Sequence, residues 1–259
     1  MSFSRKSSHH AYIHEYPGSG PKIVLLHGLL ASARYWHPIA RQLQRDGHHV
    51  ITIDLLGFGY AANLSASDYS YDEHVEHIYS TIQDVIGDEP FTLAGHSLGG
   101  LVAMRFARKY PKLVSQLLVF NSPFYTNAHE AQSTIIGTSR IYHFLLTSRY
   151  RTAGWAIARV VGFHLWGKHT AKAREGAIRH IVFKGQGIDD LQQLETKTVV
   201  VTGLRDRKVY IDNLMELTIP SNIKVVTAPT GHHLPRTKPQ TVKHLIQRAI
   251  TEMRTSSQS

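Results

Sequence analysis

The chain has 259 residues, of which 42% are hydrophobic and 19% charged, and its formal net charge is +10. This length suits one large domain or a domain with an insertion, and the composition is that of a globular protein. Cysteine is absent, which excludes disulfide bonds, a thiolate nucleophile and Cys-based zinc sites. No stretch approaches the roughly 18 apolar residues of a membrane span, and the N-terminus has no apolar run like that of a signal peptide. We therefore expect a cytoplasmic protein.

Short β-branched runs alternate with longer segments at helical spacing, which is typical of an α/β protein with a mostly parallel central sheet flanked by helices. Strands are predicted, in chain order, at 22–28, 48–59, 91–97, 113–122, 197–203 and 222–229. Helices are predicted at 35–46, 72–86, 98–110 and 239–253.

The alternation stops in the middle of the chain, where no core strand is evident between residues 123 and 195. Helical patterns rich in aromatic residues and Arg occur there near 140–147, 151–163 and 170–183. We therefore predict an α/β core made of residues 1–122 and 196–259, with a helical insertion at 123–195 placed before the strand that ends near Gly203.

The stretch "AGHSLGG" follows one predicted strand and precedes a helix, and it fits the pattern G-x-S-x-G. Such a sharp strand-to-helix turn strains the serine backbone and projects the hydroxyl of Ser97 from the sheet edge. Gly95 and Gly99 would be needed there because a Cβ atom would collide with the neighbouring strand and helix. The alternative is an ordinary glycine-rich turn.

A serine nucleophile needs a base that is itself oriented by an acid. Asp206 lies just after one predicted strand, and the adjacent histidines His232 and His233 follow the last one. Together with Ser97 they give the order Ser, Asp, His, each directly after a strand. Parallel strands bring such residues to one sheet edge, so we expect a catalytic triad whose base is either His232 or His233.

The stretch "LLHGLLAS" at 25–32 also follows a predicted strand directly. Acyl transfer builds negative charge on a carbonyl oxygen, and two backbone N–H groups can stabilise it. We expect one of these donors at Leu98, immediately after the nucleophile, and the other at Leu29, with Leu30 as the alternative.

These motifs resemble those of a capped, single-domain α/β-hydrolase-fold protein over nearly the whole chain, from about Tyr12 to Met253. They are "HG" at 27–28, "DLLGFG" at 54–59, "GHSLGG" at 95–100, "GLRD" at 203–206 and "GHHLPRTKP" at 231–239. In that family the catalytic histidine follows a glycine, and a proline often comes seven residues later. The resemblance therefore implies that His232 is the base, that the insertion forms a cap over the site, and that no cofactor is needed.

Two positions depart from the pattern of that family. Tyr60 stands where a serine commonly follows the second glycine of the D-x-x-G-x-G loop. The acid often found shortly before the final proline is replaced by the stretch "RTK" at 236–238. Neither departure removes a member of the triad, but both leave the subfamily undefined.

Eighteen histidines invite a metal hypothesis, but the chain lacks an HExxH motif and its histidine pairs lie in different predicted elements. We therefore expect no metal site. His27 and His96 lie inside the site motifs, and we expect them to support the site: His96 beside the nucleophile turn, and His27, next to Gly28, through a hydrogen bond to the oxyanion loop.

The segment 139–184 carries nine Lys or Arg residues and a single acid, Glu175. Three interpretations stay open: a solvated basic face, attraction of an anionic substrate, and peripheral contact with an anionic membrane surface. No nucleic-acid-binding motif is present, so a nucleic-acid partner is not expected. Seven aromatic residues of the insertion could either line an acyl pocket or form the core of the insertion itself, namely Phe124, Tyr125, Tyr142, Phe144, Trp155, Phe163 and Trp166.

The leading hypothesis is a serine hydrolase that cleaves a carboxylic ester or related acyl compound, with an apolar or anionic small molecule as its substrate. The alternative on the same triad is C–C bond hydrolysis, or cofactor-free perhydrolase or haloperoxidase chemistry. A third hypothesis is a non-catalytic ligand-binding protein of this fold. Substrate identity and oligomeric state do not follow from the sequence.

Overall fold

A computed structural model describes residues 12–64, 66–137, 148 and 167–256 of the chain. Its centre is a seven-stranded sheet of order β1-β3-β2-β4-β5-β6-β7, in which only β1 runs antiparallel to its neighbour. The strands are β1 (Ile13–Tyr16), β2 (Lys22–Leu26), β3 (His49–Ile53), β4 (Phe91–His96), β5 (Val114–Phe120), β6 (Thr198–Gly203) and β7 (Ile223–Ala228). The six predicted strands are all present, and the predicted fold class is confirmed.

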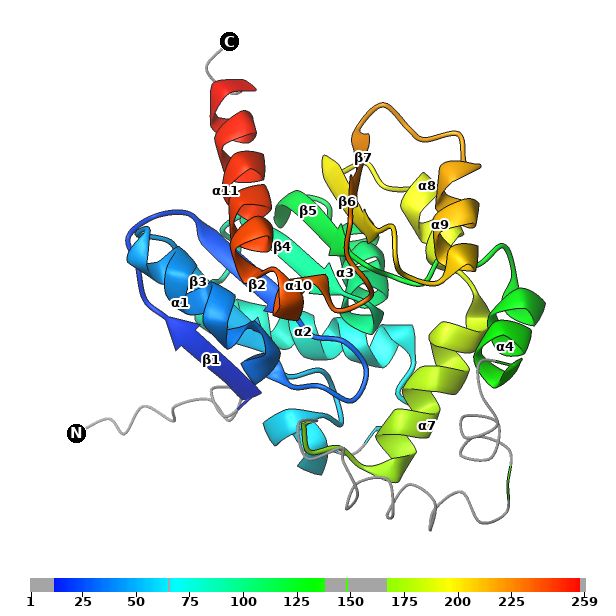
Figure 1. The fold of residues 1–259 in the computed structure, drawn as a ribbon. Helices are drawn as coiled ribbons and strands as arrows, with labels where there is room; N and C mark the ends of the chain where they lie inside the picture. Colours follow the sequence, from blue (N-terminus) through cyan, green and yellow to red (C-terminus); the bar gives the residue numbers. More distant parts are fainter. Residues whose placement is uncertain (1–11, 65, 138–147, 149–166, 257–259) are drawn as a thin grey trace.

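Helices cover both faces of this sheet (Figure 1). The α-helices are α1 (His37–Arg45), α2 (Tyr71–Val85), α3 (Leu98–Lys109), α4 (Ala128–Gly137), α7 (Ala171–His180), α8 (Gly187–Gln192), α9 (Lys208–Met215), α10 (Leu234–Thr237) and α11 (Pro239–Ser256). Short 3₁₀ helices are η2 (Ala33–Trp36), η3 (Gly59–Asn63) and η5 (Val182–Lys184). The four helices predicted from the sequence therefore correspond to α1, α2, α3 and α11.

The apolar core has two layers because successive residues of a strand point to opposite faces of the sheet. In β2, Ile23 and Leu25 pack with α1 and α11, whereas Val24 and Leu26 pack with α2, α3 and α8. All four side chains are fully buried. The central strands thus read as continuous apolar runs, which is the signal by which the sequence predicts them.

The predicted strand at 48–59 is shorter in the structure, where β3 ends at Ile53. From Asp54 onward the chain forms a loop, because the buried Asp54 carboxylate accepts hydrogen bonds from the backbone N–H groups of Ala33 and Tyr60. A Cβ atom on Gly59 would lie 2.1 Å from Asp54 Oδ1, so this loop requires glycine there. The same carboxylate ties the loop after β2 to the loop after β3.

Between β5 and β6 the described residues form helices α4, α7, η5 and α8. Helix α8 is fixed to α3 because the fully buried carboxylate of Asp190 pairs with Arg105, at 2.8 Å, and with Arg108. The patterns predicted at 140–147 and 151–163 lie outside the described residues, and the boundaries of the insertion at 123 and 195 stay a prediction.

The basic segment is only partly described, since Arg140, Arg149, Arg151 and Arg159 lie outside the described residues. Within the described part, Arg174 on α7 is only 4% exposed, so it does not belong to a solvated basic face. No helix in the described ranges is long and apolar enough to cross a membrane.

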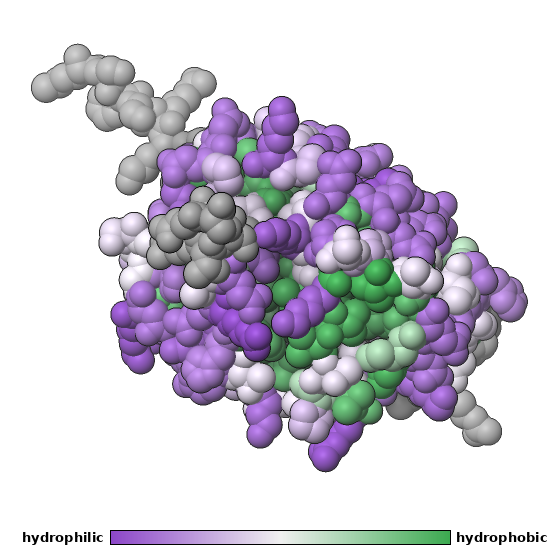
Figure 2. Space-filling view, turned by 90° about the horizontal axis from the view of Figure 1, so that it is seen from above, coloured by the Kyte–Doolittle hydropathy of each residue, from purple (hydrophilic) through white to green (hydrophobic). Residues whose placement is uncertain are grey.

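The surface at the end of the molecule that carries the C-terminus is shown in Figure 2. Hydrophobic side chains form one area on this face, and hydrophilic side chains surround it. Part of the apolar surface of the protein is thus open to solvent, as in most folded proteins.

Candidate active site

Ser97 stands between the last residue of β4 and the first residue of α3, in a backbone conformation with φ 54° and ψ −119°. A residue other than glycine rarely adopts this conformation, which aims the side chain away from the helix that follows. A Cβ atom on Gly95 would lie 2.3 Å from the carbonyl oxygen of Gly99, and one on Gly99 would lie 2.4 Å from that of His27. The two glycines are therefore required for β2, β4 and α3 to meet at this turn.

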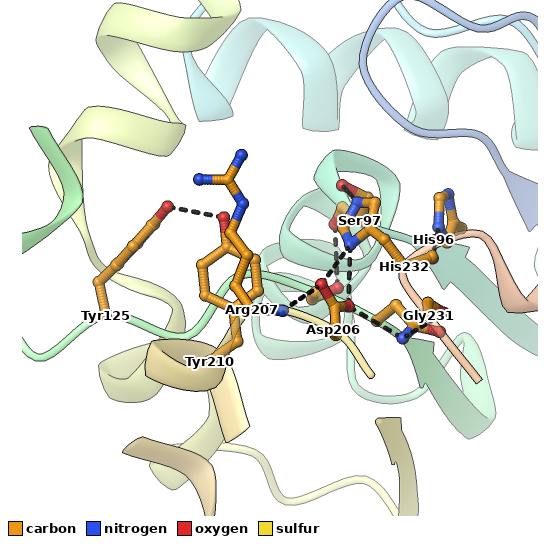
Figure 3. Close-up of polar contacts among 10 residues, drawn as sticks. His96, Ser97, Tyr125, Asp206, Arg207, Tyr210, Gly231 and His232 are labelled. Atoms are coloured by element: carbon orange, nitrogen blue, oxygen red, sulfur yellow. Dashed lines mark hydrogen bonds and ion pairs between the residues drawn. The ribbon is translucent and has the colours of Figure 1, made fainter. Parts of the chain in front are cut away.

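The structure brings Ser97, His232 and Asp206 into one chain of hydrogen bonds (Figure 3). His232 Nε2 lies 3.0 Å from Ser97 Oγ, and His232 Nδ1 lies 2.9 Å from Asp206 Oδ2. These contacts fit one tautomer, in which Nδ1–H donates to the carboxylate and Nε2 accepts from the hydroxyl. It is His232 that occupies this position, whereas His233 is the N-cap residue directly before α10 and is exposed at the edge of the site.

Asp206 lies just after β6, and two further donors hold its carboxylate. Asn121 Nδ2 donates to Oδ2 at 3.0 Å, and the backbone N–H of Arg207 donates to Oδ1 at 2.8 Å. Burial raises the pKa of Asp206. The hydrogen bond and the charge of His232, together with the hydrogen bonds from the Arg207 backbone and the Asn121 side chain, outweigh burial and lower that pKa. The carboxylate is thus ionised at neutral pH and can stabilise a positively charged imidazole.

His96 and His27 both make hydrogen bonds to the loops around Ser97. His96 Nε2–H donates to the carbonyl oxygen of His232 at 2.8 Å, and its ring stacks on Tyr35 with 5.0 Å between centroids. His27 Nδ1–H donates to the carbonyl oxygen of Gly28 at 2.8 Å, while its Nε2 accepts from the N–H of Leu55 at 3.0 Å. Burial lowers the pKa of both imidazoles, so both stay neutral and act as fixed hydrogen-bonding groups.

The residues that carry the proposed oxyanion donors line the cavity in front of Ser97. Leu98 is the first residue of α3, and Leu29 follows the His-Gly pair. In the turns and loops that the structure describes, the N–H groups of Leu29 and Leu98 donate to no backbone carbonyl. Leu30, the alternative, has a φ of 64° and a buried side chain.

Ser97, Asp206 and His232 line a cavity of about 500 Å³. Apolar side chains from the segment between β5 and β6 form one of its walls, and they are Ile135 of α4, Ile178 of α7 and Val182 of η5. Arg205, Arg207 and Tyr210 line it beside Asp206. Phe124 and Tyr125 pack in the core and do not line this cavity, and Tyr142, Phe144, Trp155, Phe163 and Trp166 lie outside the described residues.

Three residues that support this site were not predicted from the sequence. Asn121 holds Asp206, Ser122 Oγ donates to the carbonyl oxygen of Ser97 at 2.9 Å, and the Tyr35 ring packs on His96. Asn121 and Ser122 directly follow β5, at the same sheet edge as the triad. Their place at the end of the strand predicted at 113–122 is the one sequence signal that could have identified them.

Among the described residues, no group of three or more His, Asp or Glu side chains is arranged to hold a metal ion. His74 and His77 are both buried in α2, and His77 Nε2–H donates to the carbonyl oxygen of Asp54 at 2.9 Å. The two histidines therefore belong to the interior packing of the protein.

Residues 21–144 match the family described as "alpha/beta hydrolase fold". A pimeloyl-[acyl-carrier protein] methyl ester esterase of Pseudoalteromonas atlantica is 37% identical over 115 residues, which are 44% of this chain and 42% of the relative. A probable lysophospholipase of Arabidopsis thaliana, BODYGUARD 4, is 27% identical over 109 residues, or 42% of this chain and 26% of the relative. The chain thus matches less than half the length of each of these relatives.

Similarity to solved structures extends over almost the whole chain. MenH from S. aureus has a TM-score of 0.72 at 19% sequence identity, with 94% of this chain and 99% of that chain covered. At this level of identity the likeness concerns the fold. The sheet order, the turn at Ser97 and the match over residues 21–144 agree with one another, and the chain has an α/β-hydrolase fold.

Proposed function

We propose that the protein is a serine hydrolase that cleaves a carboxylic ester or a related acyl compound. The observation that carries this proposal is the hydrogen-bond chain from Ser97 Oγ through His232 to Asp206, with distances of 3.0 and 2.9 Å. A serine hydroxyl is a weak nucleophile, and this arrangement supplies both the base that removes its proton and the acid that orients the base.

In the first half of the proposed reaction, Ser97 Oγ attacks the carbonyl carbon of the ester while His232 Nε2 takes the hydroxyl proton. The carbonyl oxygen becomes an oxyanion that the N–H groups of Leu29 and Leu98 stabilise. The bond to the leaving oxygen then breaks, and His232 gives its proton to that oxygen. The products are a free alcohol and an acyl group bound to Ser97.

In the second half, a water molecule takes the place of the alcohol. His232 removes a proton from the water, the resulting hydroxide attacks the acyl carbon, and the bond to Ser97 Oγ breaks. His232 returns its proton to Ser97, and the carboxylic acid leaves. Asp206 stays ionised throughout and stabilises the imidazolium that forms in each half.

The apolar wall made by Ile135, Ile178 and Val182 supports a substrate with an apolar acyl chain. The names of the two curated relatives, an esterase and a probable lysophospholipase, are further support for ester hydrolysis. The segment between β5 and β6 would then act as a cap that excludes water from the acyl chain.

A panel of p-nitrophenyl esters of increasing acyl length tests this proposal. We expect hydrolysis by the native protein and by a Ser133→Ala control, because Ser133 is an exposed residue of α4, and none by Ser97→Ala. Inactivity of the native protein on every ester would contradict ester hydrolysis. The ligand-binding or C–C hydrolase hypotheses would then be favoured, and a vinylogous diketone substrate would distinguish them.

A further inference from the structure

A second cavity, of about 700 Å³, adjoins the active-site cavity, since Ala31 and Tyr35 line both. Its other lining residues come from five separate parts of the chain, and they are His14, Ser32, Arg34, Pro38, Asp54, Gly59, Tyr60, Gly167, Lys168 and Arg236. The triad hypothesis uses none of these residues. Tyr60 and the stretch 236–238 are also the two places where the sequence departs from the family pattern.

The charge of this second cavity is positive. Its cationic side chains are those of Arg34, Lys168 and Arg236, and none of them pairs with a carboxylate in the part of the chain that the structure describes. The one carboxylate in the lining, Asp54, is 1% exposed. Both of its oxygens accept backbone N–H groups, at 2.6 and 2.8 Å, so it is already fully engaged.

The backbone holds these cations beside the catalytic loops. Arg34 follows the oxyanion loop, and its Nη2 donates to the Tyr60 hydroxyl at 3.1 Å. The carbonyl oxygen of Lys168 accepts from the N–H of Gly59 at 2.7 Å. Arg236 lies on α10, four residues after the proposed base His232. The three positive charges are thus placed by the same segments that build the catalytic site.

Hydrogen-bond donors without a partner complete the second cavity. The hydroxyl of Tyr35 is buried and has no hydrogen-bond partner among the described residues, and the same holds for Nε2 of His14. Burial raises the pKa of Tyr35, so its hydroxyl keeps the proton and can donate it. A buried polar group without a partner costs free energy, which a ligand acceptor would recover.

We propose that this second cavity binds an anionic group, a carboxylate or a phosphate, of a substrate whose ester carbonyl lies at Ser97. The inference rests on the proposed hydrolase function and narrows the substrate class to esters that carry a negative charge. Arg34 and Arg236 supply planar guanidinium donors for the two oxygens of such a group, and Lys168 supplies a third charge. Tyr35, in the wall shared by both cavities, supplies a neutral donor.

Matched pairs of esters test this substrate class: monomethyl esters of dicarboxylic acids and methyl esters of monocarboxylic acids with the same chain length. For at least one chain length we expect kcat/KM to be about tenfold higher for the anionic ester, since hydrogen bonds to charged groups carry this much free energy. The ratio should fall with increasing salt because exposed charges are screened. The triple variant Arg34→Met, Lys168→Met and Arg236→Met should bring the ratio to about one.

The control variant removes the same charge from the opposite end of the parallel strands, where they begin. Lys112 lies two residues before β5, Lys197 directly precedes β6, Lys224 lies early in β7, and all three are exposed. The triple variant Lys112→Met, Lys197→Met and Lys224→Met should keep the native ratio. An equal loss in both triple variants would assign the effect to overall charge and overturn the proposal.

The failure of this proposal can be distinguished from the failure of the proposed function. Hydrolysis of the neutral esters without any preference for anionic ones would overturn the anion site and leave the hydrolase intact. If no ester were hydrolysed, the substrate class would fall together with the hydrolase function. Calorimetric titration with inorganic phosphate would then test the cavity itself. Binding to the native protein that is lost only in the triple variant of the second cavity would support an anion site. Absence of binding to the native protein would overturn the anion site.

Discussion

Asn121 Nδ2 donates to Asp206 Oδ2 over 3.0 Å, and the same oxygen accepts from His232 Nδ1 at 2.9 Å. Asn121 has a φ of 47°, a conformation that asparagine and glycine adopt more readily than other residues. The strand β5 ends one residue earlier, so the backbone turns there and directs the amide toward the carboxylate. Asn121 is therefore a positioning residue for the acid of the proposed triad.

Replacing Asn121 tests this role. Asn121→Gly keeps the backbone conformation but removes the donor, so the pKa of Asp206 should rise and kcat should fall by about tenfold. Asn121→Asp places a second carboxylate beside Asp206, which raises the pKa further and should lower kcat more. The measurement is kcat on the best ester of the panel, with thermal unfolding as a check on folding. Activity within twofold of native in both variants would refute the assignment.

The adjacent histidines provide a matched pair of substitutions. His232→Gln removes the group that lies 3.0 Å from Ser97 Oγ, and kcat should fall by at least about 10⁴-fold. His233→Gln changes an exposed side chain at the edge of the cavity, and most of the activity should remain. Steady-state kinetics of both variants compare them directly, and the reverse order would show that the wrong histidine was chosen.

The turn at Ser97 should tolerate no side chain at its second glycine. Gly99→Ala brings a Cβ atom to 2.4 Å from the carbonyl oxygen of His27 and 2.5 Å from that of Leu26, and backbone atoms there cannot move aside. We expect a loss of about 3 kcal/mol in unfolding free energy and a Tm lower by about 9 °C. Gly137→Ala on α4, where nothing lies within 4 Å, is the control and should not lower Tm. Equal Tm values for the two variants would contradict the packing described for this turn.

Buried neutral histidines should make the protein sensitive to acid. Burial lowers the pKa of three histidines. The pKa of His27 is lowered, that of His96 is lowered well below 6.5, and that of His74 is lowered to about 3. Between pH 6.5 and these lowered values the unfolded chain binds more protons than the folded one. The free energy of unfolding should therefore fall as pH decreases below about 6.5, by up to about 1.4 kcal/mol per pH unit for each histidine.

His74→Leu isolates one of these contributions, because neither ring nitrogen of His74 has a hydrogen-bond partner among the described residues. The variant should lose stability less steeply between pH 6 and 4.5 than the native protein, as measured by urea unfolding at several pH values. His129→Leu, at an exposed position of α4, should keep the native slope. An unchanged slope in His74→Leu would show that this residue is not held neutral.

The strands, and the placement of the candidate triad residues at strand ends, could be predicted because their signal is local. Each parallel strand is an apolar run, and Ser97, Asp206 and His232 each stand within a few residues of a strand end. The edge strand β1 was not predicted, since its four residues "IHEY" are too few to show a period and its two buried residues, Ile13 and Tyr16, point to opposite faces of the sheet. Helix α9 was missed as well, although it carries Tyr210 to the wall of the cavity.

Contacts between distant parts of the chain had no such signal. Asn121 and Asp206 are 85 residues apart, and nothing in the letters around either one indicates the hydrogen bond between them. The positive second cavity is assembled from Arg34, Lys168 and Arg236, each of which is an unremarkable surface cation in its own segment. Only the packing of the loops at the sheet edge brings these residues together.

Reaction of the intact protein with a fluorophosphonate probe tests the central claim most directly, because the probe modifies only a serine activated as a nucleophile. Tandem mass spectrometry of the digested protein should locate a single label on Ser97. Labelling should be absent in Ser97→Ala and strongly reduced in His232→Gln, which lacks the base. Absence of labelling in the native protein, or a label on Ser122 in place of Ser97, would contradict the assignment of Ser97 as the nucleophile.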